Sequence, residues 1–348
     1  MTSEPWTPLE VPPRVSTIRT IWVMLVCLIV PAVLTLLTIK GPPGPAPNTL
    51  STGGYTVSLL LFAMPVSVFG IWFFMHPREA IDRKALLFGA IAVSLLGTIL
   101  DVGFAYSFFT FPNPDSTVHF NLPAWSWGTM KFVGGYIPIE EFGFYILGAL
   151  FMITTYIWAD AEWLWMYTHP QRGDEAWEHR KIVKFSPWPV LIAVVLIAIA
   201  YVVKRSIDGS GFPGYFTFLC LLAFVPATFV IQSVGRFINW RAFFFAYAAL
   251  LLVSLLWEAT LGVPYNWWNY QCEQMMGLRI TAWANLPVEA VMLWMAGSWG
   301  AVGAYETFRM AFHLMERHEG RTFWQTLFGP VPPDGDSADP GEAPTSRQ

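Results

Sequence analysis

The chain has 348 residues, of which 55% are hydrophobic and only 13% are charged, whereas charged residues make up about 25% of an ordinary soluble domain. A soluble protein of this length could not bury so much apolar surface, so the composition indicates an integral membrane protein. The formal net charge of -4 is small, which argues against a nucleic-acid-binding protein. The three cysteines are far apart in the sequence and form neither a metal-ligand pattern nor a disulfide framework.

Eight segments are long and apolar enough to cross a bilayer, whose hydrocarbon core requires roughly 20 apolar residues per helix. In chain order they are residues 20–39, 55–75, 85–109, 138–158, 188–203, 214–234, 242–262 and 287–308. The first is longer than the apolar part of an ordinary signal peptide, and no small-residue cleavage site closes it, so we expect it to be retained. The sequence therefore predicts an all-α polytopic membrane protein with about eight transmembrane helices.

The distribution of basic residues predicts the orientation. With eight spans, the N-terminus and the even-numbered loops share one side, which carries 15 of the 20 lysines and arginines. The positive-inside rule makes this side cytoplasmic, so we expect a multi-pass protein of the cell membrane with both termini in the cytoplasm. The cytoplasmic parts would be an N-terminal tail (1–19), a linker (161–187) and a C-terminal tail (311–348). The end of that tail lacks apolar periodicity, and we expect it to be disordered.

The two membrane regions between these tails, residues 20–160 and 188–310, have related sequences. Five features occur in the same order in both: a tyrosine followed by a proline within a helix, a polar or basic turn, a late acid in the next helix, a long aromatic loop, and a closing proline motif. In the first half these features are Tyr55 with Pro65, residues 82–84, Asp101, the loop that follows it, and residues 137–141. In the second half they are Tyr215 with Pro226, residues 239–241, Glu258, the loop that follows it, and residues 286–290. Both proline motifs precede even-numbered spans, so we expect parallel tandem repeats that place their acids around one central cavity.

Five acids in these repeats are candidate catalytic residues, because acidic groups at membrane depth are costly and usually mark functional sites. They are Asp101, Glu140, Glu141, Glu258 and Glu289. A purely structural explanation exists for the proline motifs, since proline followed by glutamate is a favourable helix start. A helix start, however, requires no second copy, no partner acid and no flanking tryptophans, so we favour the functional interpretation.

A sixth acid and several aromatic residues are interpreted by their position. Glu306 lies beside Arg309 at the cytoplasmic end of the eighth segment, where we expect a solvated charge. Tryptophan and tyrosine often gather at membrane interfaces, but those in the acid-bearing loops are candidate substrate-binding residues, because ring faces stabilise cations. These residues are Trp125, Trp127, Trp267, Trp268 and Tyr270. Carboxyl groups in apolar sites can donate protons, so such a cavity suits chemistry that makes carbocations from alkenes.

The run from Pro138 to Phe142, the run from Leu286 to Ala290 and the duplicated arrangement resemble the small-domain lycopene cyclases. This family includes the heterodimeric cyclases of Gram-positive bacteria and the cyclase portion of fungal fused cyclase/phytoene synthases. Each domain of the family carries one Pro-x-Glu motif and two domains make the enzyme. The resemblance covers about residues 55–160 and 213–308, and it implies two such domains fused in one chain. Ala290 stands where the first motif has Glu141, so we expect unequal halves.

The resemblance implies redox-neutral closure of the end rings of a linear carotene, with a hydrophobic polyene and the lipid bilayer as partners and with no cofactor or metal. An acid protonates the terminal double bond, the next double bond attacks the cation, and loss of a ring proton completes the ring. Glu140, Glu141 and Glu289 are carried over by motif as acid and base candidates, whereas Asp101 and Glu258 are added from their position alone.

Two alternatives remain open. A carotenoid hydratase would protonate the same kind of alkene and capture the cation with water, which requires a wet pocket. A non-catalytic carotenoid- or lipid-binding membrane protein, or a transporter, would require no proton donor, and the helix prolines Pro65 and Pro226 are compatible with it. A prenyltransferase is disfavoured, because the sequence has no Asp-x-x-x-Asp cluster to hold magnesium and diphosphate.

Overall fold

The fold is taken from a computed structural model that describes residues 53–75, 82–118, 124–126, 131–133, 137–164, 182–183, 185–317 and 322–329. The first expected span (20–39), the N-terminal tail, the end of the C-terminal tail and most of the linker lie outside these residues. The expectations for those segments therefore stay predictions.

The described part of the chain is mostly helical. Its α-helices are α2 (Gly54–Ser58), α3 (Leu60–Met75), α4 (Arg83–Phe108), α5 (Ile139–Trp158), α6 (Pro187–Ile207), α7 (Gly214–Phe218), α8 (Val225–Val234), α9 (Trp240–Trp257), α10 (Val288–Arg317) and α11 (Phe323–Phe328). Three π-helical turns extend or join them: η2 (Ala159–Trp163), η5 (Leu219–Phe224) and η6 (Glu258–Gly262). Two short 3-10 turns, η1 (Pro114–Ser116) and η7 (Cys272–Gln274), lie in the long loops.

Six helical stretches in the described residues are long and apolar enough to cross a membrane. They are Gly54–Phe73, Arg83–Phe108, Ile139–Trp163, Pro187–Ile207, Gly214–Val234 and Trp240–Gly262. They coincide with the second to seventh expected spans, and they indicate a mostly helical, membrane-embedded protein. Six of the eight expected spans are therefore supported, and the count of eight is not confirmed.

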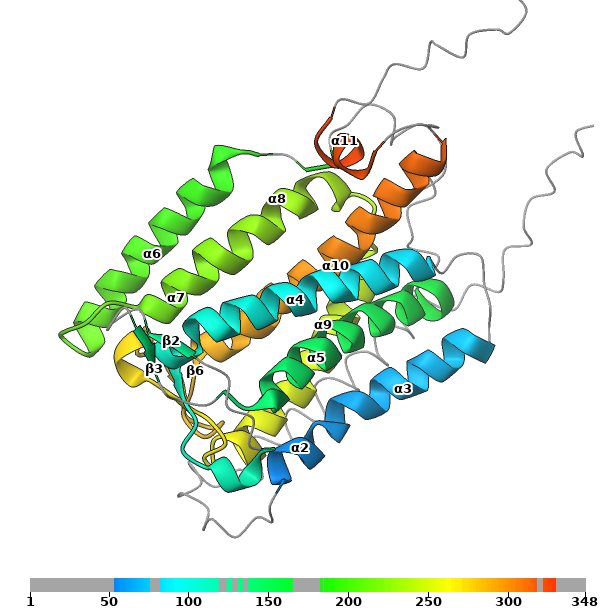
Figure 1. Cartoon of the computed structure of the whole chain (residues 1–348). Coiled ribbons are helices and arrows are strands. Elements are labelled where there is room, and N and C mark those ends of the chain that lie inside the picture. The colour runs from blue at the N-terminus through cyan, green and yellow to red at the C-terminus, as the bar shows by residue number, and fades with distance from the viewer. Residues whose placement is uncertain are drawn as a thin grey trace, which may run out of the picture.

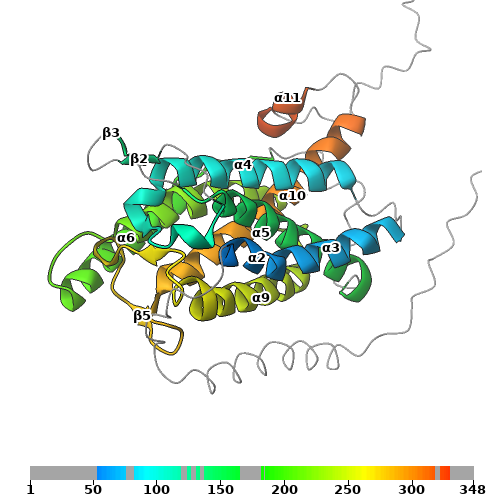
Figure 2. The ribbon, with the colours of Figure 1, turned by 60° about the horizontal axis from the view of Figure 1, so that its bottom comes forward.

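The eighth expected span forms helix α10, which is not one of the six apolar stretches because glycine, tryptophan and polar residues interrupt its apolar sequence. α10 contacts α4, α5, α8 and α9, and Figure 1 shows it in orange among the other helices. In Figure 2, α5 and α10 lie between α4 and α9, and these two inner helices contact both outer ones. α5 and α10 therefore form the centre of the bundle.

Two helices of the bundle begin with the same kind of cap. The Asp82 side chain accepts a hydrogen bond from the Ala85 backbone N–H at 2.9 Å at the start of α4, and the Asn239 side chain accepts one from the Ala242 N–H at 3.3 Å at the start of α9. Such caps satisfy amides that have no partner within the helix. The polar turns noted in the sequence are therefore helix starts.

Short strands gather at one end of the bundle, which we call the loop end (Figure 1). Asp101 in the last third of α4 and Glu258 at the start of η6 lie toward this end. The strands form three antiparallel pairs: β1 (Phe109–Thr110) with β4 (Asn269–Tyr270), β2 (Ala124–Ser126) with β3 (Lys131–Val133), and β5 (Arg279–Ile280) with β6 (Leu286–Pro287). The β1–β4 pair joins the loop that follows α4 to the loop that follows η6.

Side-chain amides reinforce the join between these two loops in both directions. The Asn113 amide donates to the Tyr265 carbonyl at 2.9 Å, and the Gln271 amide donates to the Tyr106 carbonyl at 2.7 Å. We call these bonds and the β1–β4 pair the seam. Buried polar groups gain stability only when they are paired, so the seam fixes the relative position of the two loops.

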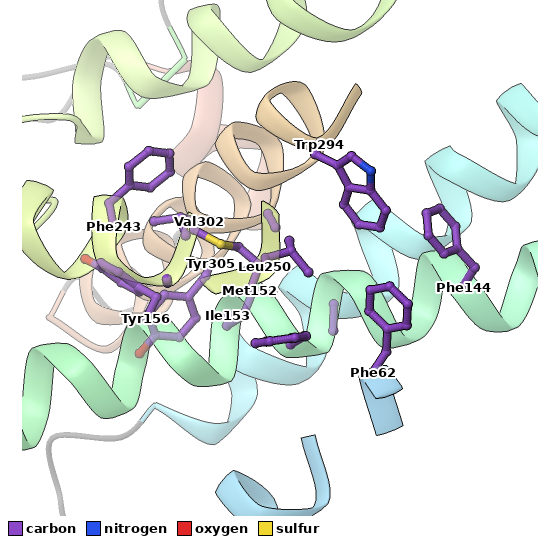
Figure 3. Close-up of a cluster of buried hydrophobic side chains, with 14 of the residues drawn as sticks. Phe62, Phe144, Met152, Ile153, Tyr156, Phe243, Leu250, Trp294, Val302 and Tyr305 are labelled. Carbon is purple, nitrogen blue, oxygen red and sulfur yellow. The ribbon is translucent and has the colours of Figure 1, made fainter. Parts of the chain in front are cut away.

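Aromatic side chains fill the space between α3, α5, α9 and α10. This packed aromatic cluster consists of Phe62, Phe144, Phe151, Trp257 and Trp294, which are all buried. The rings of Phe62 and Trp294 are stacked with centroids 5.8 Å apart, and those of Phe144 and Trp257 with centroids 5.4 Å apart. Figure 3 shows Phe62, Phe144 and Trp294 pointing toward one another. Such ring contacts add to the stability that burial provides.

Candidate functional site

A cavity of about 270 Å³ lies between α4, α10 and the stretch from α7 to α8. Its wall is apolar, and Asp101 is the only charged residue among the described residues that line it. Small residues keep the space open on α10, where a Cβ atom added to Gly297 or Gly300 would meet no atom of the described residues within 4 Å. We call this space the open cavity.

Asp101 lies near the middle of the α4 wall of the open cavity, since the lining residues of this helix run from Ala92 to Phe108. Its side chain is only 4% exposed, and its Oδ1 atom accepts a hydrogen bond from the Tyr145 hydroxyl at 3.3 Å. Its Oδ2 atom is buried and has no hydrogen-bond partner among the described residues. The rings of Phe104, Phe108 and Tyr215 also line this cavity. The site therefore combines an acid, one oxygen of which has no partner in the described part of the chain, with several aromatic rings.

A second cavity of about 30 Å³ adjoins the first, since Phe109, Tyr145 and Leu293 line both. Glu141 and Glu258 contribute carboxyl groups to this small cavity. The structure thus brings together three of the five acids expected from the sequence, Asp101, Glu141 and Glu258, around two neighbouring spaces.

Glu258 begins the π-helical turn η6, and both of its carboxyl oxygens accept hydrogen bonds. Oε2 accepts from the Tyr270 hydroxyl at 2.5 Å, and Oε1 accepts from the Trp294 indole N–H at 2.7 Å. Burial, reinforced by the nearby Glu258 carboxyl group, raises the pKa of Tyr270 above its usual range. The Tyr270 hydroxyl therefore keeps its proton and stays a donor to Glu258.

Glu141 lies in the first turn of α5 and accepts a hydrogen bond from the Tyr55 hydroxyl at 2.6 Å. The Tyr55 ring is stacked on Trp267 with centroids 5.3 Å apart, and its centroid is 5.4 Å from that of Trp268. Trp268 also lines the small cavity. Trp268 and Tyr270, two of the aromatic residues that the sequence identified as candidates, therefore line the small cavity, whereas Trp267 contacts the site only through its stacking on Tyr55.

Glu140 and Glu289, the glutamates that follow each proline by two residues, are bonded to the loops. Glu140 Oε1 accepts from the Val118 backbone N–H at 2.8 Å and from the Thr56 hydroxyl, and Glu289 Oε1 accepts from the Met276 N–H at 2.5 Å. Val118 follows η1 at the same spacing at which Met276 follows η7. Neither glutamate lines the open or the small cavity. Their contacts support a role in holding the loops.

Lys204 of α6 assists this arrangement in the second loop. Its side chain is only 1% exposed, and its ammonium group donates to the Met275 carbonyl at 2.6 Å and to the Asp208 carboxylate at 3.1 Å. Glu289 takes the N–H of the next residue, Met276. Lys204 and Glu289 therefore hold two successive residues of one loop, Met275 and Met276. The buried ammonium group of Lys204 is paired with the Asp208 carboxylate, as a buried charge requires.

Two of the expected aromatic residues are not placed at the site. Trp125 lies in β2, where the structure describes the backbone and not the side chain, and Trp127 lies outside the described residues. Conversely, Tyr145 and Trp294 were not identified from the sequence, although each donates a hydrogen bond to a late acid. Both lie seven positions after the proline of their motif, Pro138 or Pro287, and extending the comparison of the two halves would have found them.

The expectation that Glu306 is a solvated charge is wrong. Its side chain is 1% exposed, and its Oε1 accepts a hydrogen bond from the Tyr156 hydroxyl at 2.7 Å and lies 3.8 Å from an Arg309 nitrogen. Tyr156 belongs to α5, so this hydrogen-bond donor to Glu306 comes from a distant part of the sequence. The sequence showed only the neighbouring arginine.

The site thus consists of three carboxyl groups, their phenol and indole donors, and an apolar cavity that one of the carboxyl groups reaches. No protein-family model matches the sequence, and no curated protein or solved structure shows significant similarity to the chain. The function must therefore be argued from these groups.

Proposed function

We propose that the chain is a lycopene-type carotenoid cyclase of the membrane, which closes the end rings of a linear carotene. The observation that carries the proposal is the position of Asp101 in the wall of an apolar cavity, as a buried carboxyl group with one oxygen that has no partner among the residues that the structure describes. Carboxylic acids in apolar protein sites can serve as proton donors. An apolar polyene matches the rest of the wall, because its burial there is favourable.

In the proposed reaction, Asp101 transfers its proton to the terminal double bond of the polyene and leaves a carbocation. The next double bond attacks this cation, which forms the ring carbon–carbon bond. Loss of one ring proton to a carboxylate then restores a double bond. One proton is gained and one is lost, so the product is an isomer of the substrate and no electron acceptor is consumed. The rings of Phe104, Phe108 and Tyr215 would stabilise the positive charge.

Glu141 and Glu258 are the candidate bases, since they line the adjoining small cavity. The proposal gives Glu140 and Glu289 a different role from the one that the family resemblance implies. Their carboxyl groups accept hydrogen bonds from backbone N–H groups of the two loops, so they would position the loops that close the site.

We also propose that the two halves are duplicates arranged in parallel. The capping residue of each helix precedes its late acid by the same number of residues, from Asp82 to Asp101 and from Asn239 to Glu258. Each late acid accepts a hydrogen bond from an aromatic residue seven positions after a motif proline. Equivalent contacts at equivalent positions support a common origin for the two halves.

Cyclisation is favoured over the two alternatives by the composition of the cavity wall. A hydratase would have to hold a water molecule against the cation, and the wall offers few polar groups for that purpose. A simple carrier would not require a buried acid, whose burial is costly.

Expression in a bacterium that accumulates lycopene tests the proposal. We expect cyclic carotenes in the pigment extract when the protein is present in the membrane fraction. Hydroxylated acyclic products would instead support the hydratase, and unchanged lycopene with normal amounts of membrane protein would refute both enzyme proposals.

The proposed orientation has its own test, because Cys272 is exposed at the loop end. A thiol reagent that cannot cross membranes should label it in intact spheroplasts, since the loop end would be outside the cytoplasm. The Cys272→Ser variant is the control and should lose this label. Labelling of Cys272 only in inverted vesicles would reverse the orientation.

A further inference from the structure

The open cavity and the packed aromatic cluster occupy corresponding places in the two halves. Positions can be matched by counting from the helix prolines, from the late acids and from the motif prolines. The cavity residues and their counterparts in the cluster are Ala223 with Phe62, Leu100 with Trp257, and Gly300 with Phe151. In each pair the cavity has the smaller side chain.

These three differences in side-chain size contribute to the difference in packing between the two places. Phe62, Phe151 and Trp257 are buried and in ring contact with one another or with their neighbours. A protein interior is close-packed, so three aromatic rings leave no room for a ligand of comparable size. On the other side, Ala223 and Gly300 leave the space that forms the open cavity.

The open cavity has the shape for one end of a long chain. On α4 its lining extends from Ala92 to Phe108, which is about 24 Å at the usual rise of an α-helix. Leu96 of α4 and Leu222 of η5 line the cavity and are also 50% and 39% exposed. Both lie within apolar stretches long enough to cross a membrane. The mouth between them would therefore face lipid tails rather than water.

We propose that the open cavity is the single binding site for one end of one linear apolar polyene, which enters sideways from the bilayer between α4 and the η5–α8 stretch. The packed aromatic cluster closes the corresponding place in the other half. The identity of the polyene rests on the proposed function. One site means one ring per binding event, so a chain with two reactive ends must leave and return in the opposite direction before its second end reacts.

Binding of the polyene tests the site separately from catalysis. Protein purified from lycopene-accumulating cells should carry extractable polyene, and Gly300→Leu should reduce the bound amount by about tenfold or more, because its side chain would occupy the ligand space. Gly70→Leu on α3 is the matched control, since a Cβ at Gly70 also meets no atom within 4 Å but Gly70 does not line the open cavity. Equal binding by Gly300→Leu and the wild type, or no bound polyene in the wild type, would overturn the inference.

The number of rings closed per binding event is measured by a chase. Membranes are given labelled lycopene and then a large excess of unlabelled lycopene. We expect the label to be retained in a released product with one ring. A labelled product with two rings, formed without a released one-ring product, would overturn the single-site inference.

The two proposals can fail independently. If polyene binds in a manner sensitive to Gly300→Leu and no ring forms, the binding site stands and the cyclase proposal fails. If rings form and Gly300→Leu retains both binding and conversion, the cyclase proposal stands and the site is elsewhere.

Discussion

The open cavity and the packed aromatic cluster show how similar arrangements of helices can serve different purposes. Around the cluster, Phe62, Phe151 and Trp257 are buried against neighbouring rings. Around the cavity, Ala223 and Gly300 leave space beside Asp101. In both regions a late acid accepts a hydrogen bond from an aromatic donor. Smaller side chains, together with the π-helical turn η5, therefore distinguish the candidate binding site from the structural region.

The largest effect is expected from Asp101→Asn, which removes the proton donor from the open cavity. Conversion of lycopene should fall about 100-fold or more, the usual loss when a general acid is removed, while polyene binding is retained. Asp82→Asn on the same helix is the control, because asparagine caps a helix as well as aspartate does. Pigment analysis of both variants at equal membrane content measures the difference, and normal conversion by Asp101→Asn would remove Asp101 from the mechanism.

Substitutions in the packed aromatic cluster should lower the stability of the protein more than substitutions around the open cavity. Phe62→Ala removes a fully buried ring, and we expect it to lower the free energy of unfolding by about 3 kcal/mol. Leu222→Ala at the mouth of the cavity, where the side chain is partly exposed, should cost less than about 1 kcal/mol. Thermal unfolding of the purified variants in detergent compares them. Equal losses would show that the cluster is not a more tightly packed region than the cavity.

Neighbouring glutamates of the first proline motif should behave differently. Glu141→Gln replaces a carboxyl group of the small cavity by an amide, and we expect the initial rate of lycopene conversion to fall about tenfold. Glu140→Gln keeps an oxygen that can accept the Val118 amide, so its rate should stay within about twofold of the wild type. The reverse order would return the catalytic role to Glu140 and favour the assignment by motif.

The smallest effect is expected at Tyr270, between the two regions. Tyr270→Phe removes one donor to Glu258 and should cost about 1 kcal/mol near pH 7. Because the pKa of Tyr270 is raised by burial in the folded protein, the unfolded chain loses this proton first as the pH rises above about 10, and the stability of the fold declines. The wild type should therefore lose more stability than Tyr270→Phe between about pH 9 and 11. Parallel declines in the two proteins would contradict the shift.

Much of the fold could be predicted because membrane helices carry their signal locally. A run of apolar residues of sufficient length indicates a span without reference to the rest of the chain, and six such runs are helices in the structure. α10 is a helix as expected. It packs against other helices on several sides, and such a position tolerates glycine and polar residues, which lower the hydrophobicity by which a span is recognised.

The site was only partly predictable, since it depends on which way side chains face. Glu140 and Glu141 are adjacent, yet successive residues of a helix point about 100° apart, and only Glu141 lines a cavity. In the sequence, Glu306 resembles a solvated charge at a helix end. In the structure it accepts a hydrogen bond from Tyr156, which belongs to another helix. The open cavity has no signal in any one segment, because α4, α10 and the α7–α8 stretch all contribute to it.

The seam has a consequence for the continuity of the chain. Asn113 of the first loop and Gln271 of the second each bind the opposite loop, and β1 pairs with β4. Fragments separated within residues 165–181 would each retain one side of this interface. The covalent connection would then supply a high effective concentration of one half near the other, as a tether does, while the seam and the packing of α4 against α10 and of α5 against α9 would hold the halves together.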